Sequence, residues 1–145
     1  MPTVTLPYYV RKESRIPSRY SKKSMANRFT QKAQNTLNRA LMYARELGHT
    51  YIGSEHILLG LLGEREGVGA KLLEARGVTL ESVRDVIIRV SGVGIPSVVT
   101  PSDMTPRVKK IIELASYESL KNKQTYIGTE HILLALLEEK ECTAH

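Results

Sequence analysis

The sequence predicts an all-α fold made of two pseudo-symmetric helical repeats, each a four-helix unit. The first observation is an internal duplication: residues 50–62 are TYIGSEHILLGLL and residues 125–137 are TYIGTEHILLALL, so eleven of thirteen positions agree at an offset of 75. The second is that apolar residues recur every three or four positions around both segments, as on one face of a helix. A gapless duplication of this kind indicates a repeated supersecondary unit.

Length and composition are typical of one globular domain. The chain has 145 residues, of which 41% are hydrophobic, and no apolar run approaches the ~20 residues of a membrane-spanning helix. We therefore expect no membrane association. The single cysteine, Cys142, excludes a disulfide within the chain and favours a reducing compartment such as the cytoplasm.

The positive charge is concentrated at the amino-terminal end. Residues 1–24 hold six Lys or Arg and one acidic residue, whereas the remainder has fifteen basic and fourteen acidic residues. Three prolines and the absence of a sustained apolar period predict that residues 1–24 form a flexible basic arm. The arm is short for a transit peptide, which leaves the chloroplast stroma as a minor alternative for localisation.

The first repeat, residues 29–91, contains the signals for four helices. Thr30 is a predicted N-cap before an apolar face, and Gly48 ends that helix. Gly53 permits a turn, and Ser54 is predicted to cap a leucine-rich second helix. Two further periodic segments follow, at residues 68–75 and 79–90, separated by Gly77.

The second repeat, residues 104–145, begins in the same way. After a predicted mobile linker at residues 92–103, Thr105 takes the N-cap position, and Pro106 occupies the first helical position, where its missing N–H costs little. Gly128 and Thr129 correspond to the turn and cap of the first repeat. Counterparts of the last two helices would extend to about position 165 by the offset of 75, so the second repeat is predicted to be truncated after two helices. Together, residues 25–145 form one predicted domain.

Several classes of chemistry are excluded by the motifs. No G-x-x-x-x-G-K-[ST] loop occurs for nucleotide binding, and each E-H-I-L-L segment has one histidine where a zinc protease needs two on one helix face. Cys142 has no consistent partner for nucleophilic catalysis. We therefore expect no catalytic residue, no metal and no cofactor.

The two leucine-rich helices carry the candidate site. Glu55 and Glu130 lie in the first helical turn after a glycine and a hydroxyl. They could be purely structural, because a carboxylate there stabilises the helix dipole, and spacing alone favours that interpretation. Alternatively, the N–H groups of the helix start attract phosphate while the carboxylate holds a guanidinium.

The neighbouring side chains are expected to be structural. His56 and His131 are more typical of packing or capping residues than of ligands. Two leucine groups are predicted to pack between helices rather than to form a peptide groove, with exposure as the alternative in the shortened half; they are Leu58, Leu59, Leu61 and Leu62, and their copies Leu133, Leu134, Leu136 and Leu137.

Five segments carry a resemblance to a known family: NRFTQKAQ, YIGSEHILLGLL, GVGAKLLEARGV, MTPRVKKIIELA and YIGTEHILLALL. They resemble the N-terminal double-repeat (Clp R or Clp N) domain of ClpC and, more distantly, ClpA, the ATP-binding subunits of Clp proteases. The resemblance implies an all-α domain that recruits substrates and adaptors, such as MecA- or McsB-like proteins, to a hexameric ATP-driven unfoldase. The domain itself would not be an enzyme.

The resemblance also implies a ligand. In ClpC-like domains the corresponding glutamates engage phosphorylated arginine, which transfers to Glu55 and Glu130. The phosphate would meet the helix starts and the threonine hydroxyls, so the implied site comprises Gly53, Ser54, Gly128, Thr129, Thr30 and Thr105 in addition to the glutamates.

Two other functions remain open at this point. The basic arm, with tyrosines between its cations, could bind nucleic acid, although the nearly neutral remainder offers no recognition stripe. The chain could also be a free-standing adaptor that competes for the clients of an unfoldase.

Overall fold

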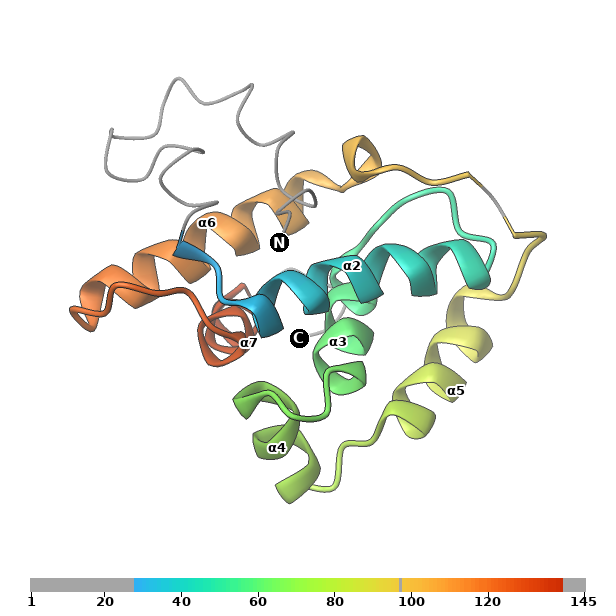
Figure 1. Cartoon of the computed structure of the whole chain (residues 1–145). Helices are drawn as coiled ribbons and strands as arrows, with labels where there is room; N and C mark the ends of the chain where they lie inside the picture. Colours follow the sequence, from blue (N-terminus) through green and yellow to red (C-terminus); the bar gives the residue numbers. More distant parts are fainter. Residues whose placement is uncertain (1–27, 97, 140–145) are drawn as a thin grey trace.

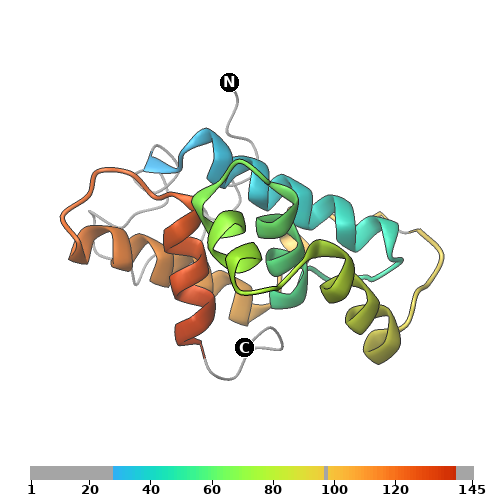
Figure 2. The same cartoon turned by 90° about the horizontal axis from the view of Figure 1, so that it is seen from below.

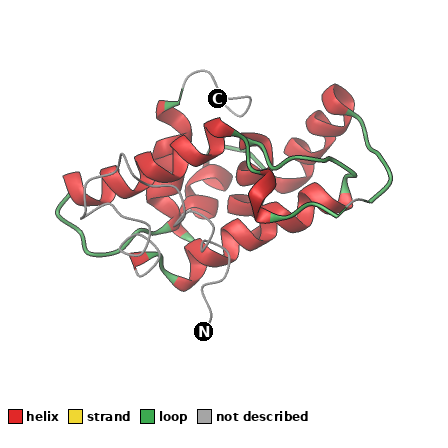
Figure 3. Ribbon diagram, turned by 90° about the horizontal axis from the view of Figure 1, so that it is seen from above, coloured by secondary structure: helices red, strands yellow, loops and turns green. Residues whose placement is uncertain are grey.

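The computed structural model describes residues 28–96 and 98–139, and within these ranges the chain is helical with no β-strand (Figures 1 and 3). The predicted arm, residues 1–24, lies outside the described residues. The elements are α2 (Gln31–Glu46), α3 (Ser54–Gly63), α4 (Val68–Ala75), α5 (Leu80–Ser91), the short 3-10 helix η3 (Pro101–Asp103), α6 (Pro106–Lys121) and α7 (Thr129–Glu138). The predicted all-α fold is confirmed. None of the described helices is long and apolar enough to cross a membrane.

Helices α2 and α3 form the first hairpin. The Thr30 hydroxyl accepts a hydrogen bond from Ala33 N at 3.1 Å, as predicted for the N-cap of α2. A Cβ on Gly60 would lie only 2.3 Å from Thr36 O, so glycine at this position allows the two helices to approach closely.

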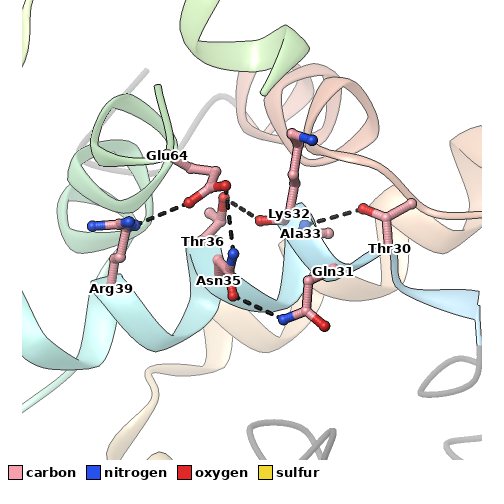
Figure 4. A network of polar contacts seen from close by, with 8 residues as sticks. All are labelled: Thr30, Gln31, Lys32, Ala33, Asn35, Thr36, Arg39 and Glu64. Carbon is pink, nitrogen blue, oxygen red and sulfur yellow. Dashed lines mark hydrogen bonds and ion pairs between the residues drawn. The ribbon is translucent and has the colours of Figure 1, made fainter. Parts of the chain in front are cut away.

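A polar network joins the end of α3 to the outer side of α2 (Figure 4). The Glu64 carboxylate accepts from Arg39 Nε at 3.1 Å and from Asn35 Nδ2 at 3.4 Å. Glu64 is buried, so these donors compensate a carboxylate that would otherwise be costly to remove from water. The second repeat has a related pair, in which Lys110 Nζ lies 3.5 Å from Glu139 Oε2.

The two repeats are joined by two short parallel bridges, one between Phe29 and Ile127 and one between Ile52 and Met104. In the first bridge, Thr30 N donates to Ile127 O at 3.0 Å. In the second, Thr105 N donates to Ile52 O at 3.1 Å. The first bridge therefore places the start of α2 beside the segment that precedes α7. The second places the start of α6 beside the segment that precedes α3.

Helix α4 packs across the repeats, against α7 (Figure 2). Gly69 N donates to the Thr129 hydroxyl at 3.0 Å, which fixes the start of α4 on the start of α7. Leu133 and Leu136 of the second repeat are buried in the main core, although no later helix of that repeat is described. The predicted packing between helices is thus confirmed for these two leucines.

The other two leucines of α7 match the alternative, exposure in the shortened half. Leu134 and Leu137 are exposed to 40% and 54%, whereas their counterparts Leu59 and Leu62 are fully buried. Leu59 belongs to a small cluster with Tyr43, Leu47 and Ile87, and Ile87 is on α5. Helix α5 therefore covers in the first repeat the face that stays open in the second.

The segment between α5 and α6 contacts the first repeat at several points. Gly94 N donates to Leu47 O at 2.8 Å, and Arg45 Nε donates to Val99 O at 2.9 Å. Val99 is buried in the main core. These contacts hold part of the predicted linker against the end of α2.

Candidate functional site

The start of α3 is capped differently from the sequence prediction. The N-cap is Gly53, and Ser54 is the first helical residue. A histidine supplies the capping bond: Gly53 N donates to His56 Nδ1 at 2.9 Å, and Gly128 N donates to His131 Nδ1 at the same distance. The prediction that Ser54 and Thr129 are caps is wrong, because Gly53 and Gly128 take the cap position: their carbonyls accept from the N–H groups three and four residues on, so the helices already include Ser54 and Thr129. The prediction that the histidines are capping or packing residues is confirmed.

The hydroxyls of Ser54 and Thr129 do not line an open surface. Both residues are buried, with 4% and 3% exposure, and the Thr129 hydroxyl accepts from Gly69 N in the contact with α4. What the first turns of α3 and α7 can offer an anion is therefore their backbone N–H groups, which a helix start leaves without intrahelical partners.

A chain of hydrogen bonds runs from the start of α3 to the end of α5. His56 Nε2 lies 2.7 Å from His49 Nδ1, and His49 Nε2 lies 2.9 Å from Gly92 O. Since His56 Nδ1 and Gly92 O accept, the consistent proton order has His56 Nε2–H donating to His49, and His49 Nε2–H donating to Gly92. Burial lowers the pKa of His56 to about 4, which keeps this ring neutral.

His49 is a residue that the sequence analysis missed. The available signal was its spacing of seven residues from His56, at the position where the second repeat has Gln124. In the second repeat, His131 Nε2 is hydrogen-bonded to Gln124 Oε1, and burial lowers the pKa of His131. Each helix start is thus held by a series of hydrogen bonds through its histidine, which continues to His49 in the first repeat and to Gln124 in the second.

Each candidate glutamate is held by a tyrosine four residues earlier. Tyr51 Oη donates to Glu55 Oε2 at 2.9 Å, and Tyr126 Oη donates to Glu130 Oε2 at 3.2 Å. The Tyr51 ring also stacks on His49, with ring centroids 5.6 Å apart. Burial and the adjacent Glu55 carboxylate raise the pKa of Tyr51, so its hydroxyl remains a proton donor to that carboxylate at neutral pH.

Among the described residues, neither glutamate has a basic side chain within ion-pair distance. Glu55 is 6% exposed, and Glu130 is half-buried. A buried carboxylate without a nearby cation favours a cationic ligand more strongly than an exposed one does, because less water screens the pair. Glu55 is therefore the stronger candidate for binding a guanidinium.

The predicted threonines lie on the opposite repeat from the helix starts that they approach. Thr105 directly follows Met104, whose bridge partner Ile52 directly precedes Gly53. In the same way, Thr30 directly follows Phe29, whose bridge partner Ile127 directly precedes Gly128. Thr30 and Thr105 each accept from the N–H three residues on, at 3.1 and 3.2 Å. A hydroxyl used as an acceptor can still donate its proton, so both remain chemically suitable for phosphate.

The described residues contain no group of three or more His, Cys, Asp or Glu placed to hold a metal ion. Cys142 lies outside the described residues. The groups that the site does offer are carboxylates, hydroxyls and helix-start N–H groups, which suit ionic and hydrogen-bonding recognition.

The chain matches the Clp repeat (R) N-terminal domain over residues 28–145. It is 46% identical over 123 residues to the ClpA homolog ATP-binding subunit of Cyanidium caldarium, covering 85% of this chain and 14% of the relative. It is 40% identical over 139 residues to chloroplastic ClpC1 of Arabidopsis thaliana, covering 93% of this chain and 15% of that protein. The chain thus spans about one seventh of the length of these relatives.

Solved structures share the fold at lower identity. The N-terminal domain of Arabidopsis thaliana ClpD superposes with a TM-score of 0.65 at 23% identity, covering 77% of each chain. The ClpV N-domain in complex with a VipB peptide superposes with a TM-score of 0.66 at 19% identity, covering 83% of this chain and 75% of that one. The family match spans both bridges and both histidine-capped helix starts, and the chain belongs to the Clp repeat N-terminal domain family.

Proposed function

We propose that this chain is a docking domain of a Clp-type unfoldase that recognises proteins carrying phosphorylated arginine, either directly or together with MecA- or McsB-like adaptors. The observation that supports it most is the pair of carboxylates, Glu55 and Glu130, each in the first turn of a helix and neither in an ion pair with a Lys or Arg of residues 28–96 and 98–139. The curated relatives are ATP-binding subunits of Clp proteases or Clp chaperones. A related N-domain of the same fold has been solved with a peptide bound.

The guanidino group and the phosphoryl group of phosphoarginine would bind to different groups of the protein. A phosphoarginine keeps a planar guanidino group with N–H donors, which a carboxylate accepts in a paired arrangement. Its phosphoryl oxygens suit the N–H groups of a helix start and a donating hydroxyl. Thr105 would serve the site of Glu55, and Thr30 the site of Glu130, so each site would draw on both repeats.

Calorimetric titration with phosphoarginine, and separately with arginine and with phosphate, tests the proposal. Loss of one charge-assisted contact costs roughly 1.5–3 kcal/mol, so Glu55→Gln or Glu130→Gln should weaken its own site by about ten- to a hundredfold. The double variant should lose binding.

Glu81→Gln is the matched control, because Glu81 also lies in the first turn of a helix, α5, but its side chain is exposed. Its affinity for phosphoarginine should equal that of the parent. A double variant that binds as well as the parent would leave the two glutamates as helix-end residues only.

Nucleic-acid binding by the arm is the second candidate function, and the six cations in residues 1–24 favour it. Such binding should weaken steeply with salt and disappear when the arm is removed, while phosphoarginine binding persists. The chloroplastic relatives make the stroma a candidate location beside the cytoplasm.

A further inference from the structure

A cleft of about 430 Å³ lies between α3 and α5, next to Glu55. Its wall on α3 is formed by Glu55 and Leu58. Its wall on α5 is formed by Ser82, Val83, Val86, Ile87, Val90 and Ser91. The volume is within the range of ordinary ligand pockets, roughly 300–1,000 Å³.

The lining is apolar except for one charge and two hydroxyls. Glu55 is the only ionisable side chain that lines the cleft, and no cation pairs with it in the part of the chain that the structure describes. On the opposite wall, Val86 is 49% exposed and Val90 is 74% exposed, so this apolar surface is reachable from solvent. A ligand that fits both features has a cationic or guanidino group and an apolar group close to it.

The cleft accompanies only one of the two glutamates. In the second repeat, the counterpart of Leu58 is Leu133, which is buried, and no helix in the position of α5 is described. Glu130 is correspondingly more exposed than Glu55. The two sites therefore share the first helical turn, but among the described residues only Glu55 has an apolar cleft beside its carboxylate.

We propose that the α3–α5 cleft is a subsite for an apolar side chain of the same client segment whose phosphoarginine pairs with Glu55. The inference rests on the proposed function and adds a sequence preference to it. Clients with an aliphatic or aromatic residue near the modified arginine bind the Glu55 site more tightly, whereas the Glu130 site is indifferent to that residue. The occupant is a peptide because the carboxylate and the apolar wall are contiguous, so two neighbouring side chains of one segment reach both.

The test compares two phosphoarginine peptides in a Glu130→Gln background, which isolates the site of Glu55. One peptide has leucine at the two positions on either side of the modified arginine, and the other has serine there. The leucine peptide should bind about tenfold more tightly. In the converse background, Glu55→Gln, the two peptides should bind equally to the Glu130 site.

The cleft itself is tested by replacing Val86 and Val90 with serine. Both side chains are largely exposed, and serine and valine have similar helix propensities, so the fold should persist by circular dichroism; Val90→Ser alone serves if the double variant unfolds. The ratio of the affinities for the leucine and serine peptides should fall to about one, while the affinity for free phosphoarginine stays unchanged. Ile95→Ser, at an 86% exposed residue outside the cleft, should keep the preference.

The possible failures are distinguishable. Equal binding of the two peptides by the Glu130→Gln protein, or a leucine preference that survives the valine replacements, overturns the subsite and leaves the proposed function intact. No binding of free phosphoarginine or of either peptide overturns the proposed function, and the subsite with it.

Discussion

The two repeats have the same helix start and different outer faces. At the start, histidine cap, glutamate and tyrosine recur at the same positions, with the same 2.9 Å capping distance. On the outer face, α5 packs against Tyr43, Leu47 and Leu59 in the first repeat. The counterparts in the second repeat are Glu118, Asn122 and Leu134, so two of the three apolar contacts have become polar. The second repeat thus keeps the residues of the candidate site but not the apolar surface on which α5, the fourth helix of the first repeat, packs.

The polar replacements form contacts of their own. Glu118 is buried and lies 3.4 Å from Lys121 Nζ. A hydrogen bond from the Glu138 carboxyl to Glu118 raises the pKa of Glu138, because the proton that they share is retained on the pair. Asn122 Nδ2 donates to Glu118 O at 2.9 Å. The polar residues on this face of the second repeat are thus paired with one another, whereas Leu134 and Leu137 are exposed among the described residues.

The largest expected difference between the repeats is in the leucines. Leu59→Ala removes a fully buried side chain and should lower the free energy of unfolding by about 2–5 kcal/mol. Leu134→Ala, at the equivalent but 40% exposed position, should cost less than about 1 kcal/mol. Urea unfolding measures both. Equal costs would mean that the face of Leu134 is covered as well as that of Leu59.

The next effect is on pH dependence. The His56 ring binds protons less readily in the folded state, with a pKa of about 4 against an ordinary value of about 6.5. The unfolded chain therefore takes up a proton first as pH falls, and stability is lost between pH of about 6.5 and about 4, by roughly 3 kcal/mol in total. His131 should act in the same direction, since its pKa is also lowered.

Proton titration by NMR separates the two rings. The His56 signals should remain those of a neutral imidazole down to pH of about 5, and protonation at Nδ1 would then displace the Gly53 N–H. A His56 ring that titrates at its ordinary pKa would show that the series of hydrogen bonds from Gly53 through the two histidines to Gly92 does not persist in solution.

The hairpin turns provide a third comparison. Gly48 has φ of +74°, and its counterpart Lys123 has φ of 60°. A Cβ on Gly48 would lie 2.2 Å from the carbonyl carbon of Gly94, so Gly48→Ala should cost at least the roughly 1–2 kcal/mol of a left-handed residue plus the clash. Lys123→Gly should instead be stabilising, by at most about 1 kcal/mol. Thermal unfolding of the two variants checks the opposite signs.

Local chemistry in the sequence predicted much of this molecule, and contacts between distant residues account for what it did not predict. Thr30, Thr105 and Pro106 lie where capping and helix-start preferences placed them. The bridges between repeats and the docking of α4 on α7 join segments about 50 to 100 residues apart, on which helical periodicity carries no information. Ser54 failed as a cap because Gly53, in extended backbone, begins the helix one residue earlier, and its carbonyl accepts from the N–H groups of His56 and Ile57.

The smallest expected effects concern the carboxylates that end the second helices. In the first repeat, Arg39 Nε lies 3.1 Å from Glu64 Oε1, and Arg39 is 40% exposed at its side chain. Arg39→Ala should cost about 0.5–1 kcal/mol, because Asn35 continues to donate to the same carboxylate. In the second repeat, Lys110 is 63% exposed and its distance to Glu139 is 3.5 Å, so Lys110→Ala should cost less than about 0.5 kcal/mol. Urea unfolding at low and high salt distinguishes the pairs, since 1 M salt screens exposed charges more than buried ones. A larger loss at Lys110 than at Arg39 would show that the second repeat depends on its surface charges more than its burial pattern implies.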